Sequence, residues 1–152
     1  MKNLFLTLLT LVSCVFYSQE IAQINGVFTT NSGIPLEGKF QNFYESGNVM
    51  FSYEILDGLH NGKFSSFYDN GKLKQKGSYL NGEKVGSWLS WSENGLLISK
   101  TGFDSHGNRD GEWIVWNNEG DYSAVVLYES GKRISNWKIV TKNGQIAQTS
   151  NN

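Results

Sequence analysis

Apolar and polar positions recur along this chain with a period of about 24 residues. A glycine followed two residues later by an aromatic residue stands at Gly38, Gly62, Gly86 and Gly111, with spacings of 24, 24 and 25 residues. Another glycine follows each of these aromatics by seven residues, and Trp137 marks a fifth, degraded copy. Self-similarity at a fixed period of this length indicates a repeat architecture, whose units bury surface by stacking on their neighbours.

Each copy contains two glycine turns separated by short apolar runs. The first turn carries Gly47, Gly71, Gly95, Gly120 and Gly144, and the second carries Gly58, Gly82, Gly107 and Gly131. Asn-Gly and related pairs between apolar runs predict β-hairpins, because glycine accepts a positive φ without steric cost. Glycines this frequent exclude long helices, so the runs are predicted to be strands. The spare residue of the 25-residue step falls near Ser105 and His106, in a second turn.

The apolar positions also predict how the strands face. Apolar residues stand two and eight residues after the first-turn glycines, as at Val49 and Ile55, and an even separation places such a pair on one face of a strand. Paired aromatics three apart are predicted to point to opposite faces; they are Phe40/Phe43, Phe64/Phe67, Trp88/Trp91 and Trp113/Trp116. We therefore expect an all-β fold: an elongated, single-layer antiparallel meander of about five stacked 24-residue hairpin repeats.

The chain divides into four predicted segments. Residues 1–18 are expected to be a signal peptide, and residues 19–37 an N-terminal strand, near Ile24–Thr30, with a cap. The repeat array is expected over residues 38–148, with copies starting near 38, 62, 86, 111 and 135. Residues 149–152 are expected to form a disordered tail.

The start of the chain predicts export. A short positive beginning and a nearly unbroken apolar run from Leu4 to Tyr17 are typical of a secretory signal peptide. Two processing routes are open: cleavage after Ser18, or lipidation at Cys14, which ends a lipobox-like Leu-Val-Ser-Cys sequence. We expect a periplasmic, secreted or outer-membrane-associated protein, held at a membrane only if Cys14 is lipidated.

Charge and cysteine content narrow the classes of partner. The formal net charge is −1, which gives no global attraction to nucleic acid, so no nucleic-acid partner is expected. Cys14 is the single cysteine and lies in the leader, so neither a disulfide framework nor a cysteine metal site is expected in the mature domain.

Residues with catalytic or metal-binding chemistry are sparse. His60 and His106 are predicted to be solvated or locally bonded turn residues. The carboxylates of the second turns are also expected to be solvated rather than to bind calcium; they are Asp57, Glu83, Asp104, Asp110 and Glu112. No catalytic, cofactor or metal site is predicted. Lys72, Lys74 and Lys76 alternate along one predicted strand and form either its solvated side or part of a surface for an anionic partner.

The aromatic columns are interpreted mainly as structural, because their period is that of the fold. Tryptophans nevertheless concentrate in two adjacent central copies, where exposed indoles could stack on sugars or on a partner's side chains. The candidate binding surface is Trp88, Trp91, Trp113, Trp116, Tyr68 and Tyr44.

The segment from Gly62 to Leu73 closely resembles the MORN repeat in its bacterial variant, a glycine, two spaced aromatics and a second glycine, and Gly86 to Leu97 matches nearly as well. The likeness extends from about Gly26 to Ile146. It implies an elongated β-array that serves as a scaffold or interaction surface, and some bacterial relatives are described as antitoxins or immunity partners. The resemblance supplies no catalytic residue.

Three classes of function are compared for a chain with these features. The leading hypothesis is an exported, non-enzymatic repeat scaffold that binds a protein, in envelope assembly or in periplasmic immunity of the antitoxin type. The alternative is a glycan- or cell-wall-binding module that uses exposed aromatics. An enzyme is disfavoured, because no nucleophile–base pair or metal set can be assembled from the sequence.

Overall fold

The computed structural model describes residues 22–24, 26–30 and 32–149. The predicted signal peptide, Cys14 and the end of the predicted tail lie outside these residues. The strands are β1 (Ala22–Ile24), β2 (Val27–Thr29), β3 (Gly38–Phe43), β4 (Val49–Leu56), β5 (Leu59–Phe67), β6 (Leu73–Leu80), β7 (Glu83–Trp91), β8 (Leu97–Phe103), β9 (Gly111–Trp116), β10 (Tyr122–Glu129), β11 (Lys132–Arg133), β12 (Lys138–Thr141) and β13 (Ile146–Thr149).

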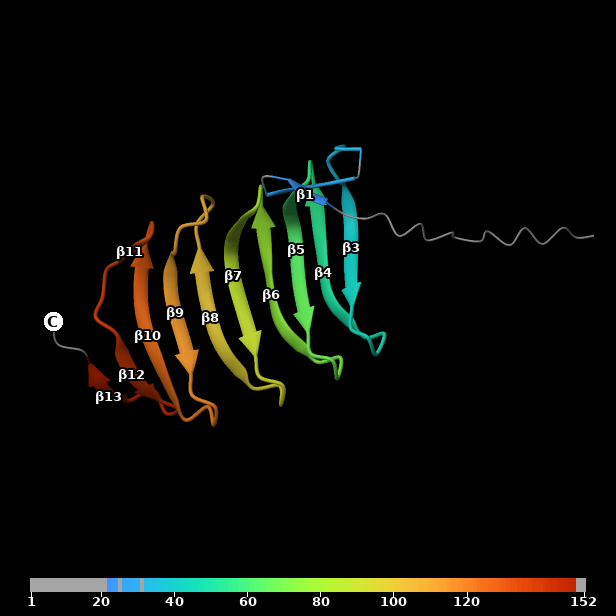
Figure 1. The fold of residues 1–152 in the computed structure, drawn as a ribbon. Coiled ribbons are helices and arrows are strands. Elements are labelled where there is room, and N and C mark those ends of the chain that lie inside the picture. Colours follow the sequence, from blue (N-terminus) through green and yellow to red (C-terminus); the bar gives the residue numbers. More distant parts are fainter. Residues whose placement is uncertain (1–21, 25, 31, 150–152) are drawn as a thin grey trace, which may run out of the picture.

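The main sheet is an open antiparallel meander, as the sequence predicts. Its strand order is β13-β12-β10-β9-β8-β7-β6-β5-β4-β3, and the short β11 pairs with β10. Figure 1 shows β3 and β13 at opposite ends of this row of hairpins. The described residues contain no helix, and so none that is long and apolar enough to cross a membrane.

Two kinds of turn connect the strands. Two-residue turns such as Asn81-Gly82 have positive φ at both positions, 49° and 88°, which is the backbone of a type I′ hairpin. The first turns are longer: the Tyr68 amide bonds the Lys72 carbonyl at 2.8 Å, and Gly71 has a φ of 78°. The spare residue lies where it was predicted, since the turn after β8 is lengthened and closes from Asp104 to Asn108.

The two faces of the sheet carry different side chains. One face, which we call the core face, is defined by the rings of Phe64, Tyr79, Trp88 and Trp113. The Trp88 ring lies 5.5 Å from the Phe64 ring and 4.9 Å from the Tyr79 ring, between ring centroids. Trp88 is only 2% exposed. A single layer thus obtains its buried centre from rings that pack along one face.

The opposite face, which we call the lysine face, is defined by Phe67, Lys74, Lys76 and Trp91. Lys76 Nζ lies 5.6 Å from the centroid of the Trp91 ring. Residues three apart, such as Trp88 and Trp91, therefore point to opposite faces, and the prediction for the paired aromatics is confirmed at this pair.

The predicted shared face of Val49 and Ile55 is wrong. A register shift between Asn42 and Phe43 places Val49 opposite Phe43, and Val49 lines a hollow with Ser52 of the lysine face. Ile55 is 3% exposed and pairs with His60 of the core face. A β-bulge shifts the alternation by one residue, so even spacing does not keep these two side chains together.

The strand predicted near Ile24–Thr30 is present as β2, but it pairs with β1 in a separate two-stranded sheet instead of joining the main sheet. It lies across the end of the sheet near β4 and β5 (Figure 1). The Phe28 amide donates to the Gly58 carbonyl at 2.7 Å, and the Gly58 amide donates to the Leu36 carbonyl at 2.9 Å. The segment before the array is therefore attached to the β4–β5 turn rather than added as an edge strand.

Candidate binding face

A row of paired residues crosses the lysine face from strand to strand. Its members in sheet order are Gln41, Ser52, Ser65, Lys76, Leu89 and Lys100, each opposite the next in register. The serines are small, so the surface is hollowed where they stand. Lys76 and Lys100 occupy equivalent places two strands apart, a separation of about 10 Å between their strands.

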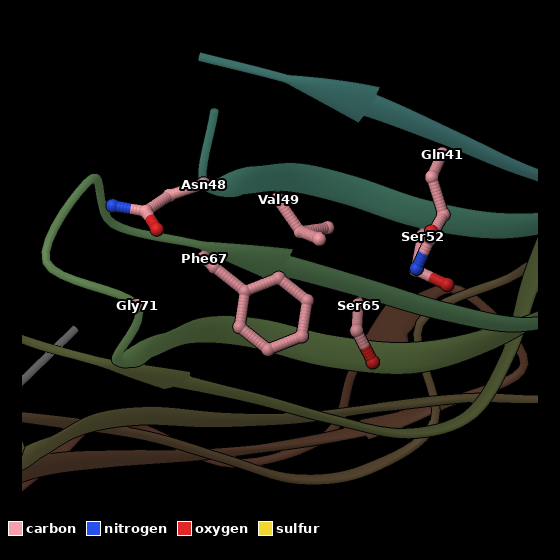
Figure 2. Close-up of a pocket in the computed structure, with 7 residues that line it drawn as sticks. All are labelled: Gln41, Asn48, Val49, Ser52, Ser65, Phe67 and Gly71. Atoms are coloured by element: carbon pink, nitrogen blue, oxygen red, sulfur yellow. The ribbon is translucent and has the colours of Figure 1, made fainter. Parts of the chain in front are cut away.

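Three hollows follow this row, with volumes of about 340, 260 and 240 Å³. The first is shown in Figure 2, where the Phe67 ring and the Val49 side chain accompany Ser52 and Ser65. The first and second hollows share Ser65, and the second and third share Ser87. Together they form one shallow depression across β3 to β9, which we call the furrow.

Aromatic side chains flank the furrow at equivalent repeat positions. They are Phe43, Phe67, Trp91 and Trp116. Phe43 is 54% exposed, and the other three are half-buried. The lysine face thus has a polar row beside an apolar row, both of which solvent reaches.

Lysines lie over two rings at this face. Lys74 Nζ is 5.4 Å from the Tyr68 ring centroid, as Lys76 Nζ is 5.6 Å from that of Trp91. Such cation–π contacts hold an ammonium group above the surface while leaving it solvated. The predicted common face of Lys74 and Lys76 is confirmed, whereas Lys72 belongs to the turn before β6.

One ion pair is found in the described part of the chain, between Lys39 Nζ and Glu54 Oε1 at 3.5 Å. The Lys63 amide donates to Glu54 Oε2 at 3.1 Å. This backbone hydrogen bond is the main cause that lowers the pKa of Glu54 from its ordinary value. Glu54 is therefore already engaged by its neighbours at the β3–β5 end of the sheet.

The structure divides the six predicted surface aromatics among three environments. Trp91 and Trp116 lie on the lysine face. Trp88 and Trp113 lie on the core face, where their indole nitrogens donate to the carbonyls of Ser78 at 3.2 Å and Gly102 at 2.9 Å. Because Trp88 is 2% exposed, its inclusion in a binding surface is wrong. Trp113 is half-buried beneath Arg109, whose Cζ lies 4.7 Å from its ring centroid.

Tyr44 and Tyr68 connect neighbouring copies. The Tyr44 hydroxyl donates to the Phe67 carbonyl and the Tyr68 hydroxyl donates to the Trp91 carbonyl, each at 2.8 Å. The two bonds are equivalent because each spans 23 residues. Both hydroxyls are therefore committed to holding the array together, and what remains for a ligand is the partly exposed ring.

His60 differs from its prediction. It lies on β5 rather than in a turn, and its ring centroid is 4.9 Å from that of Tyr79 and 5.1 Å from that of Tyr53. Its Nδ1 is buried without a hydrogen-bond partner, and burial lowers the pKa of the imidazole from its ordinary value of 6.5. His106 is an exposed turn residue, as predicted, with Nδ1 3.4 Å from Ser105 Oγ.

The place of His60 in the repeat indicates its environment in the fold. It stands two residues before Gly62, as Lys84 and Arg109 stand two residues before their own repeat glycines. Lys84 Nζ lies 4.1 Å from the Trp88 ring centroid, in the same kind of place as Arg109 over Trp113. This position thus supplies a cation or an imidazole to the core-face rings.

Two carboxylates of the second turns, Asp104 and Asp110, have local hydrogen-bond partners. Asp104 Oδ1 accepts from the amides of His106 at 2.8 Å and Asn108 at 2.9 Å, and hydrogen bonds from Asn108 lead the causes that lower the pKa of Asp104. Asp110 accepts from the Ser130 amide at 3.2 Å. Within the described residues, no group of three or more His, Cys, Asp or Glu side chains could hold a metal ion.

Comparisons with known proteins identify the repeat. No curated protein matches the chain. Among solved structures, a chain from the crystal structure of a GtfA/B complex bound to UDP and GlcNAc is similar at a TM-score of 0.37 and 11% identity, over 70% of this chain and 24% of that chain. The model of the MORN repeat variant matches residues 36–54 and 61–81. Residues 36–54 and 61–81 are therefore MORN repeats of the variant type.

Proposed function

We propose that this chain is an exported, non-enzymatic repeat scaffold that binds another protein through its lysine face. The observation that carries the proposal is the row of equivalent aromatics on that face, of which Phe43 is 54% exposed. The core-face rings pack against one another, which gives them a structural role. Phe43, in contrast, is more than half exposed to solvent. Exposed aromatics beside polar groups are typical of protein interfaces.

The absence of enzymatic activity is part of the proposal. MORN repeats are not a known family of enzymes. The polar residues that line the three hollows of the lysine face are serines, lysines, Gln41, Asn48, Thr101, Asp110 and Glu112, a set that includes no histidine or cysteine. Export rests on the leader sequence alone, through the positive start and the apolar run that precede the array. Envelope assembly and periplasmic immunity are the two settings in which we place such a scaffold.

Glycan binding is the second candidate, and one specific observation favours it. Trp91 and Trp116 are half-exposed at equivalent positions of one face, as in surfaces that stack on sugar rings. Against it, the ring of Trp91 already carries Lys76 at 5.6 Å. A soluble cell-wall glycan that shifts the tryptophan emission of the protein, with loss of that shift in Trp91→Ala, would move glycan binding ahead of protein binding.

The test of the protein-binding proposal uses two exposed aromatics on opposite faces. Phe43 is 54% exposed on the lysine face and Tyr122 is 50% exposed on the core face. Affinity purification from the cells that make the protein should recover a partner with wild type and with Tyr122→Asp, and lose it with Phe43→Asp. Recovery of the same partner with Phe43→Asp would contradict the proposed face.

A further inference from the structure

We infer that the partner segment on the lysine face is an extended, acidic stretch of polypeptide that lies along the furrow, across the strands. This inference rests on the proposed function, because it names the kind of protein segment that the proposed face accepts. It adds the charge of the partner and the path that the segment follows.

Positive charge is concentrated on the lysine face. Four exposed lysines of β5, β6 and β8 have no carboxylate within ion-pair distance in the described part of the chain; they are Lys63, Lys74, Lys76 and Lys100. Of these, Lys63 interacts at longer range with Glu54, whose pKa its charge helps to lower. The chain as a whole has a formal net charge of −1, so this accumulation is local. Unpaired cations gathered on one surface attract an acidic partner, accelerate its association and discriminate against basic segments.

The furrow also limits where the acidic segment lies. Lys63, Lys76 and Lys100 line its second and third hollows, while Asp110, just before β9, and Glu112 of β9 line the end of the third. An acidic segment is attracted to the lysines and repelled by this acidic end. We therefore place it over β3 to β8, which is the part of the face that carries the aromatics Phe43, Phe67 and Trp91.

Two features favour a polypeptide over a glycan. The rings of Tyr68 and Trp91 each have a lysine ammonium within 5.4 and 5.6 Å, so the groups that meet a ligand first are cations rather than bare aromatic faces. The first hollow, of about 340 Å³, has Val49 and Phe67 in its lining and can receive an apolar side chain (Figure 2). An acidic polypeptide segment can supply both groups that this face would bind: carboxylates for the lysines and an apolar side chain for the first hollow.

The experiment measures binding of a fluorescent probe to the whole protein. The probe is a peptide of glutamates with one central leucine, and the comparison probes are its lysine counterpart and polygalacturonate, an acidic glycan. We expect the glutamate peptide to bind, the lysine peptide not to bind, and binding to weaken between about 0.05 and 0.5 M salt as the charges are screened.

Matched charge reversals locate the site. Lys63→Glu, Lys76→Glu and Lys100→Glu combined should weaken binding of the glutamate peptide by about tenfold or more. The control combines Lys132→Glu, Arg133→Glu and Lys142→Glu, three exposed residues outside the furrow. It makes the same change in net charge and should leave affinity within about twofold. All six residues are exposed, so both variants are expected to fold, which circular dichroism checks.

Other outcomes overturn the inference in distinct ways. Equal weakening by the two triple variants would mean that net charge alone acts, and no binding of the glutamate peptide would also refute the inference. Tighter binding of polygalacturonate than of the peptide would assign the furrow to glycans. A cellular partner lost with Phe43→Asp but retained by the furrow triple variant would refute the acidic segment and leave the proposed function standing. A partner retained by both variants would refute the proposed function itself.

Discussion

The indole of Trp88 lies against the backbone of Gly77, so closely that a Cβ on Gly77 would overlap the ring atoms Cδ2 and Cε2. The Trp88 nitrogen then donates to the carbonyl of Ser78, the next residue, at 3.2 Å. A glycine is required at position 77 because any side chain would overlap the indole. Its backbone conformation does not require a glycine, because its φ is not positive. In the preceding copy Tyr53 takes the equivalent place, opposite the smaller Phe64.

Gly77→Ala is expected to destabilise the protein by about 1–3 kcal/mol, because the added methyl group must displace a packed indole. Urea unfolding followed by circular dichroism measures the change. In combination with Trp88→Phe, which provides a smaller ring, the penalty for Gly77→Ala should shrink. Strictly additive effects of the two substitutions would mean that the methyl group and the indole do not compete for space.

Trp88→Ala is expected to cost about 3–5 kcal/mol, since it removes the most buried large side chain of the core face. Trp91→Ala, three residues away on the lysine face, should cost clearly less because that ring is partly in solvent. The free energies of unfolding of the two variants compare the faces directly. Similar losses at both positions would contradict the assignment of the buried packing to the core face rather than to the lysine face.

Tyr68→Phe is expected to lower the free energy of unfolding by about 0.5–1.5 kcal/mol, because the Trp91 carbonyl loses the hydroxyl that donates to it at 2.8 Å. Tyr44→Phe should act alike through the Phe67 carbonyl. Tyr122→Phe is the matched control, since Tyr122 is 50% exposed and should change stability little. A cost at Tyr122 equal to that at Tyr68 would show that the hydroxyl bond between copies is not what stabilises the array.

Stability is expected to depend on the protonation of His60. Burial lowers the pKa of His60 below 6.5 in the folded protein, so the unfolded chain binds a proton that the folded chain does not. The stability that comes from neutral His60 is complete above about pH 6.5 and is lost as the pH falls toward the folded pKa. His60→Gln should flatten the curve of stability against pH between about pH 5 and 7. An unchanged slope in His60→Gln would assign the effect to other groups.

The sequence predicts the topology better than it predicts the side-chain environment. Recurring glycines with positive φ, such as Gly71, and the alternation between them are enough to derive the meander and even the lengthened turn near His106. Bulges are not visible in a period, so the faces of Val49 and Ile55 were misassigned. The environment of His60 depends on rings from β4 and β6, which only the folded register brings together.

The candidate site was predictable only in part. The tryptophan-rich centre was found, but it combines Trp88 of the core face with Trp91 of the lysine face. The furrow was missed because its row takes one residue from each strand, such as Ser65, Lys76 and Lys100, and only the register aligns them. The 24-residue spacing of Lys76 and Lys100 was the available signal.

The most direct test of this account is site-specific photo-crosslinking in the cells that make the protein. A photoreactive residue replaces either Trp91 on the lysine face or Val115, which is 54% exposed on the core face. The account predicts a crosslinked partner protein from position 91 and none from position 115. A partner that crosslinks from position 115 and not from position 91 would contradict the assignment of the lysine face as the binding face.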